Sequence, residues 1–103
     1  MPAPAALPPS ACASLADVRR EIDRLDAAIV GLLAERGHYV LAAARFKRNA
    51  AEVHAPDRVE QVIRNVREAA AAAGGLPDVV ERGYRALIEA YTDAERAERN
   101  RLP

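Results

Sequence analysis

Residues 15–47 read LADVRREIDRLDAAIVGLLAERGHYVLAAARFK and contain the clearest structural signal in the chain. Their apolar residues recur every three or four positions, which is the a/d pattern of a helix that packs along its length against other helices. The pattern consists of Leu15, Val18, Ile22, Leu25, Ile29, Leu32, Tyr39, Ala43 and Phe46. Arg36 occupies the seam position between Leu32 and Tyr39. A buried cation is costly without a partner, so Arg36 indicates either an internal carboxylate or an anionic ligand.

Local signals mark the ends of this first helix. Ser14, followed by Asp17 three residues later, is typical of a helix N-terminus. We expect the helix to run from there to about Lys47, a length of roughly 50 Å at 1.5 Å per residue. Gly37 lies off the apolar seam and is expected to weaken the helix slightly. Residues 48–55 lose the helical period and are expected to form a loop.

Two further helices are expected after this loop. Pro56 suits the first turn of a second helix, and Gly74 with Gly75 is expected to end it. Pro77 is expected to begin a third helix, which has an apolar stripe and then a charged tail over residues 95–101. The sequence therefore predicts an all-α chain of three helices, of which the first is the longest.

Charge and residue content exclude several kinds of function. Fifteen basic residues balance fifteen acidic ones, so no bulk positive field is present for nucleic acid or an anionic membrane, and any anion site must be local. The single cysteine, Cys12, permits no internal disulfide. His38 and His54 are too isolated to form a metal site, and we expect surface or structural roles for both.

Residues 1–13 are rich in proline and alanine and have no charged side chain. We expect them to form a disordered arm, followed by a helical domain over residues 14–103. No stretch is expected to be long and apolar enough to span a bilayer. These features predict a cytoplasmic protein with no membrane segment.

The expected helix lengths predict an oligomer. The second and third helices are each expected to be half to three quarters as long as the first, so they cannot cover both ends of its apolar seam. A bare apolar stripe of that length favours aggregation unless another surface covers it. We therefore expect an obligate homodimer in which the first helix pairs with its copy.

Several charged residues are candidates for an anion site. Arg36 and Lys47 are eleven residues apart, so a continuous helix would return them to nearly one face with backbones roughly 16 Å apart, leaving room for a small dianion. Arg19 lies seventeen residues before Arg36, roughly 25 Å away, and could join the site only from the partner of an antiparallel dimer. Arg58 lies in the first turn of the second helix, where N–H groups favour an anion. Glu95 follows the apolar stripe of the third helix and is expected to point inward.

Each of these residues also has a structural alternative. Arg36 can pair with an internal glutamate, and Arg19 and Lys47 can be solvated surface charges. Arg58 can bond a neighbouring carboxylate, and Glu95 can begin the solvated tail. Taken singly, the residues favour these alternatives, and only their joint pattern favours an anion site.

The stretch at residues 15–47, with VHAPDRV at residues 53–59, resembles the AroQ-type chorismate mutase family. It resembles in particular the isochorismate pyruvate lyases of salicylate and siderophore biosynthesis. The shared motifs are I-D-x-x-D-x-x-I-V from Ile22, the arginine seventeen residues after Arg19, and R-F-K ending at Lys47. The resemblance implies an intertwined, all-helical homodimer of the chorismate mutase type II fold, with two identical sites and no cofactor or metal.

The resemblance also implies roles for the candidate residues. Arg19 from one subunit would join Arg36, Lys47, Arg58 and Glu95 from the other around a small dianion, chorismate or isochorismate. The three arginines would bind and orient the carboxylates, while Lys47 and Glu95 would flank the ether oxygen. The expected reaction is the pericyclic rearrangement of chorismate to prephenate. The alternatives are isochorismate cleavage to salicylate and pyruvate, and a non-catalytic helical dimer.

Two departures bear on this expectation. Many bacterial members carry glutamine where Glu95 stands, and a carboxyl group donates a hydrogen bond only when it is protonated. Mutases of the familiar bacterial type place acidic residues at the positions of Ala55 and Val59, which are apolar here. The lyase-like relatives share these apolar residues and Tyr91, so this departure favours isochorismate, whereas Glu95 favours the mutase.

Overall fold

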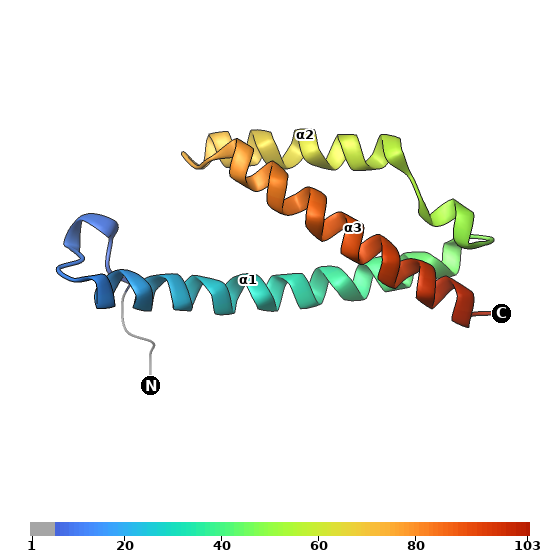
Figure 1. Ribbon diagram of the computed structural model, residues 1–103, viewed down its shortest axis with the longest axis horizontal. Coiled ribbons are helices and arrows are strands. Elements are labelled where there is room, and N and C mark those ends of the chain that lie inside the picture. The colour runs from blue at the N-terminus through green and yellow to red at the C-terminus, as the bar shows by residue number, and fades with distance from the viewer. Residues whose placement is uncertain (1–5) are drawn as a thin grey trace. The chain divides into compact units, whose positions relative to one another are not determined.

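The computed structural model describes residues 6–103, and the described residues form helices and connecting turns without a β-strand (Figure 1). The α-helices are α1 (Leu15–Ala43), α2 (Pro56–Ala72) and α3 (Pro77–Arg101). Three short 3-10 helices accompany them: η1 (Pro9–Ala11), η2 (Ala44–Phe46) and η3 (Ala50–Val53). The prediction of an all-α chain with three helices is confirmed.

The chain divides into two compact units, Met1–Arg36 and Gly37–Pro103. The first unit contains most of α1, and the second contains the end of α1 with η2, η3, α2 and α3. We describe each unit by itself.

In the first unit, side chains cap the start of α1 as predicted. The Ser14 hydroxyl oxygen accepts a hydrogen bond from the Asp17 N–H at 3.1 Å, and the Asp17 carboxylate accepts one from the Ala13 N–H at 2.9 Å. The first bond satisfies a donor that a helix N-terminus leaves without a partner, and the second ties the residue before the cap to the first turn. Of the arm predicted to be disordered, residues 1–5 lie outside the described residues, and the remainder includes η1. Disorder of the arm stays a prediction.

The predicted end of the first helix is wrong by four residues. α1 ends at Ala43, and η2 follows, with the Lys47 N–H bonded to the Ala44 carbonyl at 3.2 Å. Lys47 itself has extended backbone angles, φ −101° and ψ 140°. Because a 3-10 turn has a larger rise and fewer residues per turn, the regular α-helical spacing assumed between Arg36 and Lys47 is also wrong.

The segment predicted as a loop, residues 48–55, contains the turn η3. The Asn49 side chain caps this turn by accepting a hydrogen bond from the Glu52 N–H at 3.2 Å. Val53 at the end of the turn is 5% exposed. An apolar side chain therefore anchors the connection between η2 and α2 in the core of the second unit.

Helix α2 begins and ends as predicted. Pro56 occupies its first turn, where a missing N–H costs little. At its C-terminus the Gly75 N–H bonds to the Ala70 carbonyl at 2.8 Å, and the Gly74 N–H bonds to the Ala71 carbonyl at 3.0 Å. This is a Schellman motif, and Gly74 has the positive φ, 73°, that the motif requires.

Helix α3 begins at Pro77 as predicted, and its charged tail over residues 95–101 is helical through Arg101. It has 25 residues against 29 in α1 and 17 in α2. Because α1 is shorter than expected, the expected length ratio holds for α2 and is wrong for α3. Helix length alone no longer supports a dimer.

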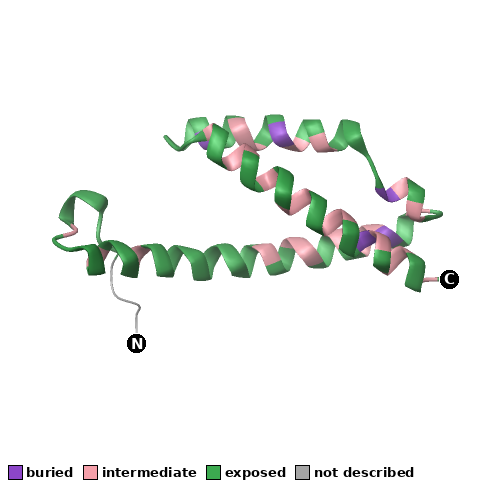
Figure 2. Cartoon of the chain, in the orientation of Figure 1, coloured by how far each residue is buried: buried purple, intermediate pink, exposed green. Residues whose placement is uncertain are grey.

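The core of the second unit lies along α3. Helix α2 packs antiparallel against α3, and η2 and η3 also contact α3 (Figure 1). The buried residues are Ala44, Val53, Ile63, Ala70 and Glu95 (Figure 2). Four of these five residues are apolar, so the exception, a buried carboxylate, needs an explanation.

The apolar seam of α1 in the first unit is exposed (Figure 2). Its six residues keep between 40% and 66% of their surface accessible: Leu15, Val18, Ile22, Leu25, Ile29 and Leu32. An apolar stripe this long on one helix face is typical of an interaction surface.

The prediction that no stretch could span a membrane is wrong by length and composition. The helical segment Leu15–Phe46 is long and apolar enough to cross a bilayer. Core helices of soluble proteins meet the same criterion. In addition, the adjacent charged residues Glu35 and Arg36 lie within this segment, and ionised groups inside a bilayer are costly. The segment by itself does not indicate a membrane span.

Candidate active site

Lys47 and Glu95 form the central ion pair of the second unit. The Lys47 Nζ lies 2.5 Å from the Glu95 Oε2. Glu95 is 8% exposed as a residue, and the two side chains are 27% and 10% exposed, respectively. Two residues 48 positions apart in sequence are thus brought into contact, and they are the two that the family resemblance assigns to the ether oxygen.

The local backbone structure around Lys47 and Glu95 explains how their side chains come into contact. The turn η2 ends α1 around Ala44, which is fully buried, and the extended backbone at Lys47 follows it directly. Glu95 lies on α3 on the same face as Ile88 and Thr92, because positions i, i+4 and i+7 coincide on an α-helix. The pair therefore joins the start of the η2–α2 connection to the inner face of α3.

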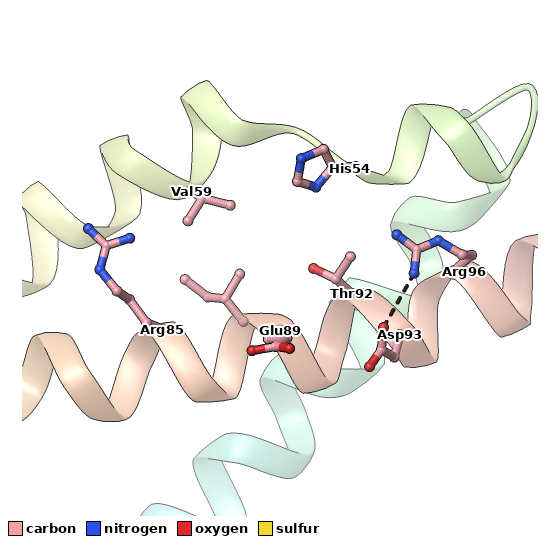
Figure 3. A pocket seen from close by; sticks show the side chains of 8 residues that line it. His54, Val59, Arg85, Glu89, Thr92, Asp93 and Arg96 are labelled. Carbon is pink, nitrogen blue, oxygen red and sulfur yellow. Dashed lines mark hydrogen bonds and ion pairs between the residues drawn. The ribbon is translucent and has the colours of Figure 1, made fainter.

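A pocket of about 260 Å³ lies in the second unit, between α3, the start of α2 and the connection that precedes α2 (Figure 3). Its lining residues are His54, Val59, Arg85, Ile88, Glu89, Thr92, Asp93 and Arg96. Ile88 and Thr92, on the α3 face that also presents Glu95, are among them. The pocket and the Lys47–Glu95 pair thus share one face of α3.

Most charged groups of the pocket are paired with other protein groups. The Arg85 guanidinium donates to both carboxylate oxygens of Glu60 at 2.8 and 2.9 Å and to Glu81 at 2.8 Å. Arg96 donates to Asp93 at 3.3 Å, as the dashed line in Figure 3 marks. We call Arg85, Glu60 and Glu81 the Arg85 cluster.

The Arg85 cluster also sets local protonation. Hydrogen bonds from Arg85 hold the pKa of Glu60 and of Glu81 below the ordinary glutamate value, and a bond from Arg67 adds to the effect on Glu81. The same two carboxylates raise the pKa of Arg85, with Glu60 the larger cause. All three groups are therefore ionised near neutral pH, and the cluster links α2 to α3.

Arg58 lies beside the pocket residue Val59 in the first turn of α2. It is exposed, and its guanidinium donates to the Gln61 side-chain oxygen at 2.9 Å. The structural alternative for Arg58 was a bond to a neighbouring carboxylate. The observed partner, Gln61, is neutral, so that alternative is not what the structure shows. Arg58 thus keeps a charge that no carboxylate within hydrogen-bonding distance neutralises among the described residues.

Arg19 and Arg36 belong to the first unit. Arg19 is exposed on α1, and Arg36 is partly buried. Their place in an anion site remains a prediction, as does the role of each of the five predicted site residues.

Gly37 makes a close approach that sequence reasoning missed. A Cβ atom at Gly37 would lie 3.0 Å from the Tyr91 Cε1 and 3.3 Å from its hydroxyl oxygen. The absence of a side chain thus lets the Tyr91 ring, one helical turn before Glu95, pack against the end of α1. The pattern alone had indicated only a weak point in the helix.

The role of His54 and Thr92 as pocket residues was not predicted from the sequence. Surface or structural roles were expected for His54, which is exposed but lines the pocket, and no motif singled out Thr92. The helical spacing of Arg85, Ile88, Thr92 and Arg96 on one face of α3 was the available signal. Within residues 6–103, no group of three His, Cys, Asp or Glu side chains is arranged to hold a metal ion.

Comparison with known proteins identifies the family. The family model for chorismate mutase type II matches residues 18–96. The isochorismate pyruvate lyase of Pseudomonas aeruginosa is 47% identical over 55 residues, which is 53% of this chain and 54% of that protein. The chain thus spans about half the length of this curated relative. Because the family model matches most of the chain, including α2 and nearly all of α1, the chain belongs to the chorismate mutase type II family of enzymes.

Proposed function

We propose that this chain is a cytoplasmic chorismate mutase that rearranges chorismate to prephenate without a cofactor. The observation that carries this proposal is the Lys47–Glu95 contact beside the pocket. A buried ion pair is an expensive way to stabilise a small core, because an apolar pair of similar size usually does as well. The cost of placing these two groups in the core therefore favours a role beyond packing.

The chemistry matches these groups. Chorismate is a dianion with an enolpyruvyl ether, and its rearrangement passes through a compact cyclic transition state that needs no nucleophile. Negative charge grows on the ether oxygen as the bond to it breaks. A Lys47 ammonium held at that oxygen stabilises the transition state more than the ground state and so accelerates the step.

Glu95 contributes in its protonated form. As a carboxylate it neutralises Lys47, and the two groups lie 2.5 Å apart. Once protonated, the carboxyl group can donate a hydrogen bond to the ether oxygen and leave the Lys47 charge available for the same atom. We therefore expect turnover to improve toward acidic pH.

The pH dependence tests this role. Glu95→Gln supplies a permanent N–H donor, so the variant should give a flatter profile of kcat against pH than the natural chain. Steady-state kinetics across the acidic range would measure both profiles. If neither the pH nor the substitution changes the rate, Glu95 has no part in the mechanism.

Three arginines complete the proposed site. Arg58 and Arg36 of one subunit, with Arg19 of its partner, would hold the two carboxylates, because guanidinium groups match carboxylates in charge and geometry. The proposed homodimer is supported by the exposed apolar seam of α1, whose residues follow the heptad spacing of paired helices. A second copy of the chain is the occupant that this regular spacing fits.

Isochorismate cleavage to salicylate and pyruvate is the second candidate. Ala55 and Val59 at the start of α2 carry no acid, and the relative from Pseudomonas aeruginosa bears the name of that activity. A product assay separates the two reactions: purified protein is supplied with chorismate or with isochorismate, and products are identified by chromatography. Prephenate supports the mutase, and salicylate with pyruvate supports the lyase.

The non-catalytic alternative predicts no product from either compound. Titration calorimetry with a bicyclic transition-state analogue would then decide the matter. An absence of binding heat, together with an absence of products, would leave a helical dimer without a catalytic site and refute the proposed function.

A further inference from the structure

Besides the Glu89 carboxylate, two polar side chains of the pocket have no partner among the described residues. The His54 imidazole reaches the pocket from the connection before α2, and Thr92 faces it from α3 (Figure 3). Neither side chain makes a hydrogen bond or an ion pair with any part of residues 6–103, whereas Arg85, Asp93 and Arg96 are all paired. The neutral hydrogen-bonding capacity of the pocket therefore resides in His54 and Thr92.

We infer that His54 and Thr92 bind the ring hydroxyl of the substrate and select for it. This inference rests on the proposed function, since it assigns one group of a cyclic dicarboxylate substrate that also bears a secondary alcohol. An alcohol both donates and accepts hydrogen bonds. Threonine hydroxyl and neutral imidazole offer both capacities as well, so the pair can satisfy the alcohol completely.

Charge determines which end of the substrate can enter this pocket. The lining arginines Arg85 and Arg96 are paired with protein carboxylates, whereas the Glu89 carboxylate lines the pocket without a cation among the described residues and opposes the entry of a substrate carboxylate. Lys47 and Arg58 lie outside the lining and are the cationic groups of the second unit proposed for the anionic end. A neutral ring edge with its hydroxyl is therefore the part of the dianion that fits here.

The apolar walls agree with this assignment. Val59 and Ile88 line the pocket and provide surfaces for the C–H groups of a ring. Val59 and Ala55 at the start of α2 have no side-chain donor or acceptor. Recognition of the hydroxyl must therefore come from α3 and from the connection before α2, where Thr92 and His54 lie.

Glu89 is the competing acceptor. It is exposed and lines the pocket, and a carboxylate can accept a hydrogen bond from an alcohol. We assign the hydroxyl to Thr92, which is partly shielded from water so that a hydrogen bond there competes less with solvent. His54 is assigned as the second partner because an imidazole can also donate a hydrogen bond to the alcohol oxygen, which the Glu89 carboxylate cannot do. Glu89→Met removes the acceptor, keeps a side chain of similar length, and so tests the competing assignment.

The experiment measures hydroxyl selectivity, defined as the ratio of kcat/KM for the substrate to kcat/KM for its analogue without the ring hydroxyl. The substrate is chorismate or isochorismate, whichever the natural chain converts. Thr92→Val keeps the side-chain shape and removes the hydroxyl, and His54→Leu removes the imidazole. Each variant should lower the selectivity by about 5- to 10-fold, because it removes one hydrogen bond that only the substrate can form.

Two controls separate recognition from damage to the pocket. Thr92→Ser restores a hydroxyl and should recover most of the selectivity lost in Thr92→Val. Ile88→Val trims the apolar wall and should lower kcat/KM for both compounds by similar factors, leaving the selectivity unchanged. Thermal unfolding followed by circular dichroism checks folding, and His54→Leu, in an exposed connection, retains the test if Thr92→Val unfolds.

The outcomes distinguish the inference from the function on which it rests. If the natural chain converts neither compound, the proposed function fails and this inference fails with it. If the natural chain is active but both variants keep full selectivity, the inference alone is overturned. Loss of selectivity in Glu89→Met without loss in Thr92→Val also overturns it.

Discussion

The Lys47–Glu95 pair allows a direct measurement of how strongly two site residues are coupled. Lys47→Met removes the ammonium group, keeps a flexible chain of similar length, and leaves the Glu95 carboxylate at 8% exposure without its cation. Breaking a fully buried pair costs about 3–5 kcal/mol. The Lys47 side chain is 27% exposed, so water compensates in part, and we expect a loss of about 2 kcal/mol in the free energy of unfolding.

The second substitution should cost less. Glu95→Gln keeps the shape and an oxygen acceptor for the ammonium, so we expect a loss of about 1 kcal/mol. In the double variant the charged partners are both absent, and the total loss should fall short of the sum by about 1–2 kcal/mol. That shortfall is the coupling energy.

Urea unfolding followed by circular dichroism gives each free energy. All four proteins must be compared at one protomer concentration, because dimerisation would contribute to stability. The exposed pair Arg48–Glu52 is a matched control: its atoms lie 2.6 Å apart, and its side chains are 88% and 31% exposed. Its coupling should be much weaker than that of Lys47 and Glu95, because water screens both of its side chains. Losses at Lys47 and Glu95 that simply add would refute the assignment of a buried, coupled pair.

Three further outcomes are expected. Gly37→Ala should displace the Tyr91 ring, because the new Cβ would lie 3.0 Å from it, and should cost about 1–2 kcal/mol by the same unfolding assay; unchanged stability would contradict the close approach. The lowered pKa values of the glutamates in the Arg85 cluster stabilise the fold above their ordinary value of 4.5, and this contribution is lost as the pH falls through the lowered values. Arg85→Gln should therefore reduce the dependence of unfolding on acidic pH, and an identical pH profile would count against the cluster. Ile29→Lys should place a charge in the exposed seam of α1 and give a monomer by sedimentation equilibrium, whereas an unchanged association state would exclude this seam as the dimer surface.

The helix boundaries could be predicted wherever local chemistry sets them. Ser14 caps α1 through its own hydroxyl, Pro56 begins α2, and Gly74 supplies the positive φ of the Schellman motif. The end of α1 has no such signal. There the chain tightens into η2 with Ala44 fully buried, and that packing depends on elements distant in sequence.

The site was predictable to a smaller extent. Periodicity indicated that Glu95 points inward, but its contact with Lys47 joins residues 48 apart and follows from the tertiary packing of α3. The family resemblance could pair these two residues, because members of one family share a fold and therefore share the tertiary contacts of their motif residues. His54 and Thr92 belong to no motif, and only the pocket reveals them.

The charges of the second unit connect the proposed dimer with the proposed chemistry. Lys47 and Glu95 cancel while both are ionised, so among the predicted site residues of that unit Arg58 provides the remaining positive charge. One cation does not balance a dianion in a partly desolvated site. To neutralise the dianion, the site needs either protonation of Glu95, which leaves the Lys47 charge available, or further guanidinium groups such as Arg36 and the proposed Arg19 of a second copy. We therefore expect a monomeric Ile29→Lys variant to fold in its second unit yet bind the transition-state analogue weakly at neutral pH, with partial recovery in acid. Equal affinity of the monomer and the natural chain at both pH values would show that the second unit holds the dianion without a partner.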